Sequence, residues 1–179
     1  MLFNKKASPS GSGGGNSVQV QALLPAGKTY TAAHWIIKNY INEGVKVLWI
    51  AHRSELLRQA AETFFVDTTA RTLPDRDSYK SFVVSSEFGR SVDIKNEDLV
   101  IASRQSICSG DNIELYIKWA IGKDLKADRK LLIVFDEAHH AAAKSYRTII
   151  NILKKYIPHI DILGLTATPL PPISPRTNR

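Results

Sequence analysis

Apolar runs of strand length alternate with amphipathic segments along most of this 179-residue chain. In the amphipathic segments apolar residues recur every three or four positions, which is typical of helices that bury one face. The apolar runs predict strands at residues 18–24, 45–51, 82–84, 99–102, 131–135 and 160–165. The amphipathic segments predict helices at residues 29–43, 54–65, 112–121 and 145–156. Strands that alternate with helices predict an α/β fold with a mostly parallel sheet and right-handed crossovers.

Two adjacent carboxylates, Asp136 and Glu137, directly follow the apolar strand predicted at residues 131–135. In an open parallel sheet, ligands bind beyond the carboxyl ends of the strands. A carboxylate pair at this position suits hydrolysis of a magnesium nucleotide. Asp136 can hold the magnesium shell, and Glu137 can orient the attacking water. The alternative for this pair alone is a solvated acidic turn.

Ala26, Gly27, Lys28 and Thr29 stand between the first predicted strand and the first predicted helix. Backbone N–H groups at a helix N-terminus can face an anion, the lysine can reach terminal phosphates, and the threonine hydroxyl can bind magnesium. The sequence Gly-Lys-Thr is common by chance. Its place before a helix, together with the Asp-Glu strand, favours a phosphate-binding site.

Short hydroxyl side chains also follow the last predicted strand, at Thr166 and Thr168. They belong to the same edge of the predicted sheet as the carboxylates, because the carboxyl ends of parallel strands meet there. They could link the nucleotide site to a part of the molecule that moves. The alternative is a strand end followed by a turn.

Polar residues that suit a nucleic-acid backbone follow two further strands: His52 and Arg53 after one, and Ser103, Arg104 and Gln105 after the other. Hydroxyls, amides and cationic groups there could hold a sugar-phosphate backbone without reading bases. The alternative for both arginines is an exposed loop position. A formal net charge of +7 and a pI near 9.5 also fit a polyanionic partner, although several of the basic residues stand near the chain ends.

Taken in order, these motifs resemble the superfamily-two helicases and translocases of the DEAD/DEAH-box type. Residues 47–60 resemble motif Ia of that family and residues 100–107 the segment near motif Ib. The extended Asp-Glu-Ala-His-His-Ala sequence at residues 136–141 is most similar to the branch that contains restriction-enzyme helicase subunits. The resemblance covers residues 19–169 and implies a RecA-like P-loop domain, with helices on both faces of its mostly parallel sheet.

The same resemblance implies ATP and Mg²⁺ as cofactors and nucleic acid as partner, with DNA favoured over RNA. It assigns Lys28, Asp136 and Glu137 to catalysis. It also implies that His139 bridges the acidic pair to Thr166 and transmits the nucleotide state.

The phosphate loop departs from the family pattern, which usually reads Gly-x-Gly-Lys-Thr. Here Pro25 stands two positions before Gly27, and Ala22 stands five positions before it. The simplest alignment leaves the loop two residues short, one of them a glycine. Because proline has no N–H and glycine provides positive-φ turns, we expect the short loop to bind nucleotide weakly or not at all.

The length of the chain suits one domain. We expect a flexible Gly/Ser-rich start at residues 1–17, the RecA-like domain at residues 18–170, and a Pro-rich tail or interdomain stub at residues 171–179. In the resembled family ATP binds between two RecA-like domains, so a second domain in cis or in trans would be needed. The chain alone should be weak or inactive. The alternatives are a non-hydrolysing nucleic-acid-binding module and a non-functional fragment of a disrupted helicase gene.

The remaining composition excludes several classes of protein. The one cysteine, Cys108, excludes an internal disulfide, and no apolar run of the length of a membrane span occurs. Residues 1–17 lack the apolar core of a secretory signal. We therefore expect a cytoplasmic protein without a membrane segment.

Overall fold

The computed structural model describes residues 17–21, 25–66, 73–122, 130–137 and 144–166, and six strands in this part of the chain form one sheet. Every pair of neighbouring strands runs parallel, and the order across the sheet is β1-β6-β5-β2-β4-β3. The strands are β1 (Ser17–Gln21), β2 (Lys46–Ala51), β3 (Ser81–Val84), β4 (Leu99–Ser103), β5 (Lys130–Phe135) and β6 (His159–Thr166). The α/β fold predicted from the hydrophobic pattern is confirmed.

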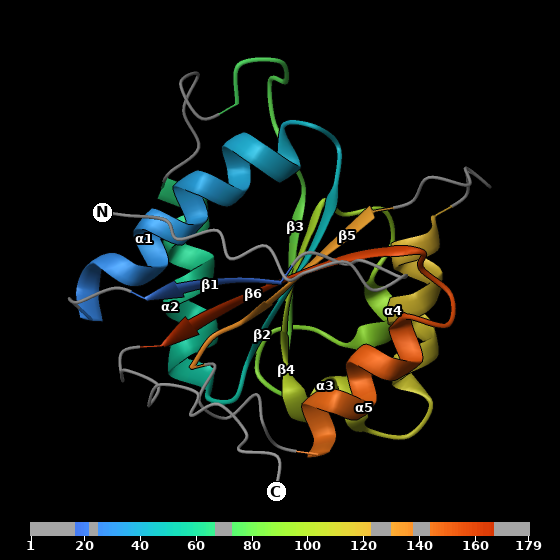
Figure 1. The fold of residues 1–179 in the computed structure, drawn as a ribbon. Helices are drawn as coiled ribbons and strands as arrows, with labels where there is room; N and C mark the ends of the chain where they lie inside the picture. Colours follow the sequence, from blue (N-terminus) through green and yellow to red (C-terminus); the bar gives the residue numbers. More distant parts are fainter. Residues whose placement is uncertain (1–16, 22–24, 67–72, 123–129, 138–143, 167–179) are drawn as a thin grey trace, which may run out of the picture.

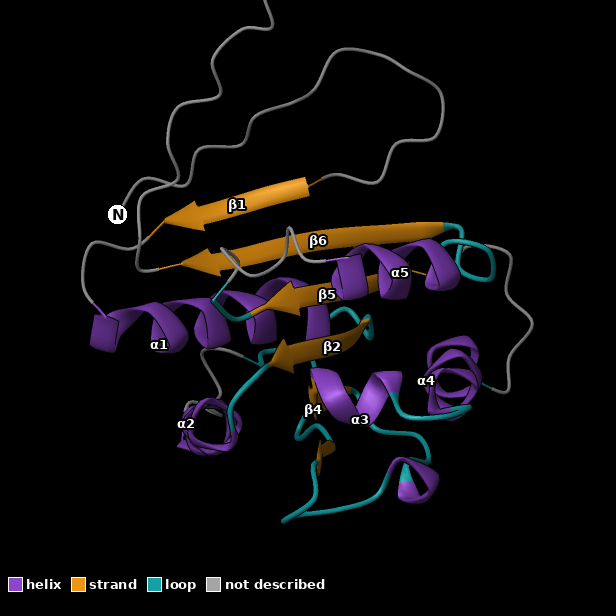
Figure 2. Cartoon of the chain, turned by 90° about the horizontal axis from the view of Figure 1, so that it is seen from below, coloured by secondary structure: helices purple, strands orange, loops and turns teal. Residues whose placement is uncertain are grey.

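Helices cover both faces of this sheet (Figure 1, Figure 2). Those packed on one face are α1 (Pro25–Ile36), the π-helical turn η1 (Ile37–Ile41) and α2 (Ser54–Val66). Those packed on the other are α3 (Arg104–Cys108), α4 (Asn112–Ile121) and α5 (Lys144–Leu153), with the short 3₁₀ turn η2 (Ser91–Asp93) beside α4. Because helices cover both faces of the sheet, its strands are continuous apolar runs rather than alternating patterns of apolar and polar residues.

Successive residues of strand β2 contribute alternately to the two hydrophobic cores. Val47, Trp49 and Ala51 contribute to the core under α1 and α2, whereas Leu48 and Ile50 contribute to the core under α3, α4 and α5. All five side chains are fully buried, because neighbouring residues of a strand point to opposite faces. The strand that precedes His52 and Arg53 is therefore held rigidly from both sides.

The first helix begins earlier than the sequence analysis predicts. α1 starts at Pro25 rather than at Thr29, so Ala26, Gly27 and Lys28 form its first turn. Proline suits the first position of a helix, because its fixed φ is helical and the N–H that it lacks would have no partner within the helix. The far end of this helix agrees with the prediction, since Gly44 with φ 73° follows the last helical turn.

Where the structure describes them, the other predicted elements agree within a few residues, but the short helices η2 and α3 were not predicted. Helix α3 follows β4 directly and is five residues long. It is capped by Ser103, whose Oγ accepts a hydrogen bond from the N–H of Ser106 at 3.0 Å. A helix of this length has too few turns to show an apolar period, so the pattern gave no sign of it.

The buried carboxylate of Asp161 connects β6 to η1 and to β5, near the amino ends of the strands. Asp161 accepts a hydrogen bond from the hydroxyl of Tyr40 at 2.8 Å and pairs with the ammonium of Lys130 at 2.9 Å. Burial, together with the hydrogen bond to Asp161, raises the pKa of Tyr40 above its ordinary range. Asp161 thus has two polar partners at the buried start of β6, which offset the cost of burying a polar group there.

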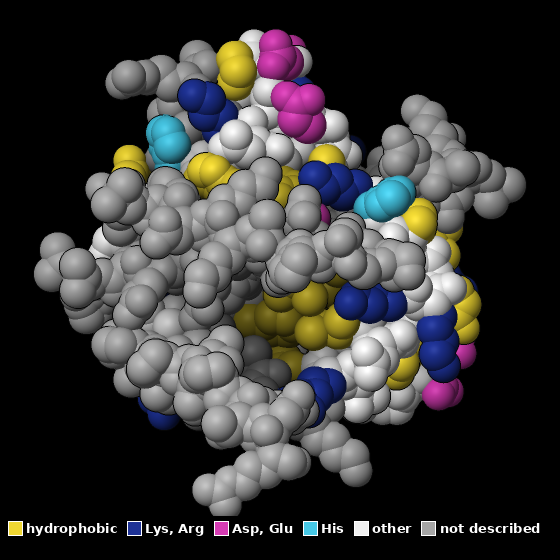
Figure 3. Space-filling view, viewed as in Figure 1, with side chains coloured by type: hydrophobic (Ala, Val, Ile, Leu, Met, Phe, Trp, Pro, Cys, Tyr) yellow, Lys and Arg dark blue, Asp and Glu magenta, His cyan; other side chains and the backbone are white. Residues whose placement is uncertain are grey.

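The visible surface has an apolar hollow near the centre of the face shown in Figure 3, and several Lys and Arg side chains lie beside it. No helix in the described part of the chain is long and apolar enough to cross a bilayer.

Phe64 and Phe65 provide a matched test of the core. Phe64 is 1% exposed and packs edge-to-face on Trp49 with ring centroids 5.4 Å apart, whereas Phe65 is 86% exposed. We expect Phe64→Ala to lower the free energy of unfolding by about 3–5 kcal/mol. Phe65→Ala should change it by less than about 0.5 kcal/mol. Urea denaturation measures both, and equal losses would contradict this account of the core.

Candidate functional site

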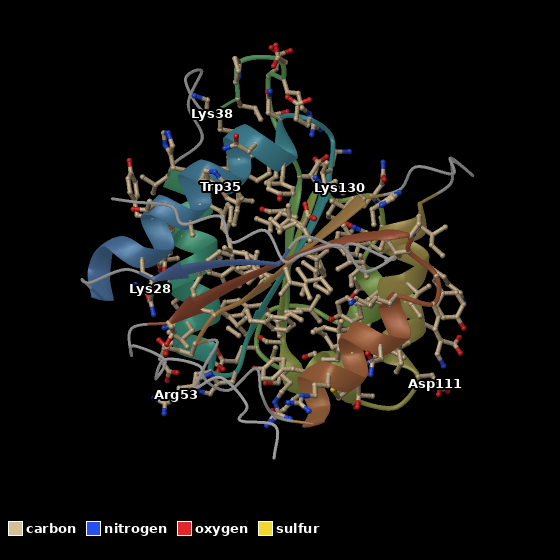
Figure 4. All side chains as sticks on the ribbon, in the orientation of Figure 1. Lys28, Trp35, Lys38, Arg53, Asp111 and Lys130 are labelled. Atoms are coloured by element: carbon tan, nitrogen blue, oxygen red, sulfur yellow. The ribbon has the colours of Figure 1, made fainter. Side chains whose placement is uncertain are left out.

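The parallel sheet brings the sequence-predicted residues to one edge. Asp136 follows β5, Thr166 ends β6, Arg53 follows β2, and Arg104 follows β4. Lys28 joins them from the first turn of α1. Figure 4 shows Lys28 and Arg53 on the same side of the molecule, with Lys38 and Lys130 at the opposite side. The chain therefore gathers residues from five distant segments at the carboxyl ends of its strands.

An ion pair between Lys28 and Glu137 forms the centre of this edge. The Nζ of Lys28 lies 2.9 Å from the Oε1 of Glu137, although the residues are 109 positions apart in the sequence. The side chain of Lys28 is 5% exposed and that of Glu137 is 21% exposed. A lysine this buried needs a charged partner, and Glu137 supplies it.

Asp136 lies beside this pair and is more deeply buried, with 2% of its surface exposed. Its backbone N–H donates to the carbonyl of Ile50 at 2.9 Å, and its Oδ1 accepts from the N–H of Glu137 at 3.0 Å. Burial raises the pKa of Asp136 to about 6. The charge of Lys28 opposes this shift, and the charge of Glu137 adds to it. The structure thus holds a carboxylate whose charged form lacks full compensation.

Glu137 has a backbone conformation that non-glycine residues rarely adopt, with φ at 57°. Conformations of this kind cost on the order of 1–3 kcal/mol and persist only where the surroundings impose them. Here the ion pair with Lys28 and the bond from the Glu137 N–H to Asp136 impose it. The side chain of Glu137 is thereby directed toward Lys28.

Two of the three threonines of the predicted site lie within the described residues. Thr29 and Thr166 are both buried, at the start of α1 and the end of β6 respectively. His139 and Thr168 lie outside the described residues, as does the side chain of Ala26. The proposed link from His139 to Thr166 therefore stays a prediction.

The predicted nucleic-acid residues line the same edge beyond Asp136. Arg53 and Gln105 are exposed, and His52 and Arg104 are partly buried. Ser103 is partly buried too, and its hydroxyl lies 2.6 Å from that of Ser106 in addition to capping α3. Ser103 thus has a structural role in turning the chain from β4 into α3, and its contact with a ligand stays a prediction.

Two aromatic residues support the acidic pair, and the sequence analysis did not assign them to the site. The indole Nε1 of Trp49 is buried without a hydrogen bond of regular geometry, yet it lies close enough to Asp136 to lower its pKa. On the opposite face, the ring of Tyr146 packs edge-to-face on Phe135 with centroids 5.0 Å apart. Trp49 stands in an apolar run, so the sequence gave no signal for it beyond burial. Tyr146 stands between Ser145 and Arg147, and from the sequence it could pack on the acidic motif or on another helix face.

The donor set fits a magnesium nucleotide. Mg²⁺ in proteins usually takes one or two carboxylates together with phosphate oxygens and water, and Asp136 is a buried carboxylate whose charge is only partly compensated. Lys28 would supply a positive charge for phosphate, and Thr29, at the next position of α1, would supply a hydroxyl; both side chains are buried. Among the residues that the structure describes, no three His, Cys, Asp or Glu side chains gather as a site for another metal.

Comparison with known families identifies the chain. The model of the family described as "Type III restriction enzyme, res subunit" matches residues 16–170. The chain belongs to this family. The family and the motif order given above agree, so the predicted membership among superfamily-two helicases is confirmed.

Individual relatives agree with this assignment. IRC3 of Saccharomyces cerevisiae, provisionally named an ATP-dependent helicase, is 29% identical over 164 residues, which cover 87% of this chain and 21% of IRC3. The helicase domain of Hef from Pyrococcus furiosus is 26% identical with a TM-score of 0.57, covering 89% of this chain and 31% of that one. The type ISP restriction-modification enzyme LlaGI shares the fold at 20% identity and a TM-score of 0.52, covering 83% and 15%.

The chain is therefore a helicase-family ATP-binding domain with the RecA-like fold of a first helicase domain. It spans about a fifth of the length of IRC3 and less than a third of the Hef chain.

Asp136→Asn tests the electrostatics of this site through stability. In the folded protein the pKa of Asp136 is about 6, above its ordinary value of 3.8, so ionisation opposes folding. Stability from this residue is thus fully present below pH 3.8 and is lost as the pH rises through 6. We expect Asp136→Asn to be more stable than the parent by about 2–3 kcal/mol at pH 7.

This gain should shrink as the pH falls toward 4, because the parent carboxyl then becomes neutral as well. Chemical denaturation at a series of pH values measures it. A variant less stable than the parent at pH 7 would contradict the raised pKa.

Proposed function

We propose that this domain binds ATP with Mg²⁺ at the edge formed by α1 and β5, and couples that binding to nucleic acid held beside it. The observation that carries the proposal is the buried ion pair between Lys28 and Glu137, next to the buried carboxylate of Asp136. Such an arrangement places a cation and two acids together in a site of low exposure, which is typical of functional sites.

The side chains have separate roles in this proposal. The ammonium of Lys28 would move from Glu137 to the terminal phosphates, and the carboxylate of Glu137 would then orient and deprotonate a water. Asp136 and Thr29 would hold the metal shell, and Thr166 would sense the change from β6. When bound, the magnesium nucleotide supplies the phosphoryl group and the charge that compensates Asp136.

The start of α1 limits how strongly phosphate is held. Pro25 has no N–H, so Ala26 and Gly27 offer the free N–H groups of the first turn. A phosphate loop with additional glycines would aim more N–H groups at the same anion. We therefore propose weak nucleotide binding, with turnover that depends on a second RecA-like domain in cis or in trans.

Nucleic acid would lie along the rest of the edge, with Arg53, Arg104 and Gln105 against its sugar-phosphate backbone. Exposed and partly exposed cationic groups suit contacts of this kind, which carry affinity without base readout. Membership of a restriction-enzyme family favours DNA over RNA as the partner of this chain. The presence of a DNA substrate mimic in the LlaGI structure favours the same choice. The extended acidic motif favours the DEAH type, and a cytoplasmic location suits these partners.

A second candidate function is a non-hydrolysing nucleic-acid-binding module. The observation that favours it is the helix start at Pro25, which leaves few N–H groups for a phosphate. The two candidates differ in nucleotide binding and agree in nucleic-acid binding.

Titration with a fluorescent ATP analogue in the presence of Mg²⁺ separates the two candidates. We expect saturable binding that Lys28→Ala reduces at least about tenfold, because the variant lacks the charge that meets the phosphates. The matched control is Lys38→Ala, at an exposed lysine on the opposite side of the molecule, which should bind like the parent. Circular dichroism verifies that Lys28→Ala is folded. No binding by the parent would favour the non-hydrolysing module.

Arg104→Ala tests the proposed nucleic-acid contact. We expect weaker binding to a fluorescein-labelled single strand and a salt slope reduced by about one, because one phosphate contact is lost. Lys155→Ala, at an exposed lysine after α5, is the control and should leave both quantities unchanged. Fluorescence anisotropy at several salt concentrations measures them. An unchanged slope in Arg104→Ala would remove this residue from the interface.

A further inference from the structure

The loop after β3 lies at the far end of the carboxyl edge. β3 is the neighbour of β4, with Val84 in register with Ala102. The carboxyl ends of β2, β4 and β3 are thus consecutive along the sheet, and each is followed by a polar segment. The loop at residues 85–89 therefore continues the row of sites that contains Arg53 and Arg104.

This loop presents an aromatic ring under a guanidinium group. Phe88 is 49% exposed, and the guanidinium carbon of Arg58 lies 6.0 Å from its ring centroid. Arg58 belongs to α2 and is itself 57% exposed. An exposed phenylalanine alone is common on protein surfaces. Its pairing with a cation at the end of a basic edge is the feature that points to a ligand.

The loop holds Phe88 in a fixed place. The N–H of Ser85 donates to the carbonyl of Gly89 at 3.1 Å, and the Oγ of Ser85 accepts from the N–H of Glu87 at 3.2 Å. Gly89 packs so closely on Phe82 that a Cβ there would lie 2.8 Å from the ring of that residue. A ring on a closed loop of this kind loses little further freedom when it meets a ligand.

We propose that Phe88 and Arg58 form a stacking site for one base of a single-stranded nucleic acid. This inference rests on the proposed function, in which Arg53 and Arg104 hold the backbone of the same strand. A base stacks on an aromatic ring irrespective of its sequence, because every base has a π-face, and arginine adds to such a stack. The site would fix the position of the strand at the edge of the sheet without reading its sequence.

Glu87 gives the proposal a second test, because its carboxylate pairs with the arginine of the site. Its carboxylate lies 3.6 Å from the guanidinium of Arg58, and both side chains are about half exposed. An exposed pair of this kind contributes little to stability. The negative charge does, however, repel phosphate and engages the arginine. Glu87→Gln should therefore tighten nucleic-acid binding, whereas Phe88→Ala should weaken it.

The test is fluorescence anisotropy with two fluorescein-labelled probes, an oligothymidylate and an abasic strand of the same length. We expect Phe88→Ala to weaken binding of the oligothymidylate about tenfold and to leave binding of the abasic strand unchanged. Phe88→Trp should retain or improve the affinity for the oligothymidylate, because it keeps the ring. The control is Phe65→Ala, which removes a more exposed phenylalanine at the other end of α2.

The outcomes separate this inference from the proposed function. If the parent binds both probes and Phe88→Ala binds them as the parent does, the stacking site is wrong and the nucleic-acid site stands. Equal weakening toward both probes would also overturn the stacking site, since abasic binding involves no base. If the parent binds neither probe, the proposed nucleic-acid function itself fails.

Discussion

The ion pair between Lys28 and Glu137 is the contact on which the rest of the site depends. It joins the first turn of α1 to the end of β5 across 109 residues of sequence, in a place where water has little access. Without the lysine, two adjacent acids would face each other at a buried strand end, and Asp136 would gain a proton more readily. The ion pair therefore favours the charged form of Asp136, and it also connects the start of α1 to the end of β5.

The two hydrophobic cores maintain this arrangement, although some of its residues destabilise the folded protein. Asp136 is buried with a raised pKa, and Glu137 has a left-handed backbone, so both residues oppose folding. Edge-to-face packing of Trp49 on Phe64 supports one face of the sheet here, and packing of Tyr146 on Phe135 supports the other. Rigid apolar contacts on both faces of the sheet, at β2 and at β5, thus maintain polar geometry that the site alone would lose.

Elements with long apolar runs were predictable, and contacts between distant segments were not. Strands β2 and β5 stand out because both of their faces are buried. The start of α1 was misjudged because Pro25 and Gly27 usually indicate a loop, whereas both fit the first turn of this helix. The site residues follow from motif order, but their pairing does not. Likewise, Arg58 and Phe88 stand thirty positions apart, and only the fold brings them together.

The order of the strands gives a physical route between the two halves of the edge. β2 lies between β5 and β4, so the strand before His52 and Arg53 is bonded to the acidic strand on one side and to the strand before Arg104 on the other. The N–H of Asp136 donates directly to Ile50, two residues before His52. Coupling between sites requires an element with two arrangements. Glu137 is well placed to be part of such an element, because its strained backbone is held by the ion pair with Lys28 and lies one residue from the bond between Asp136 and β2.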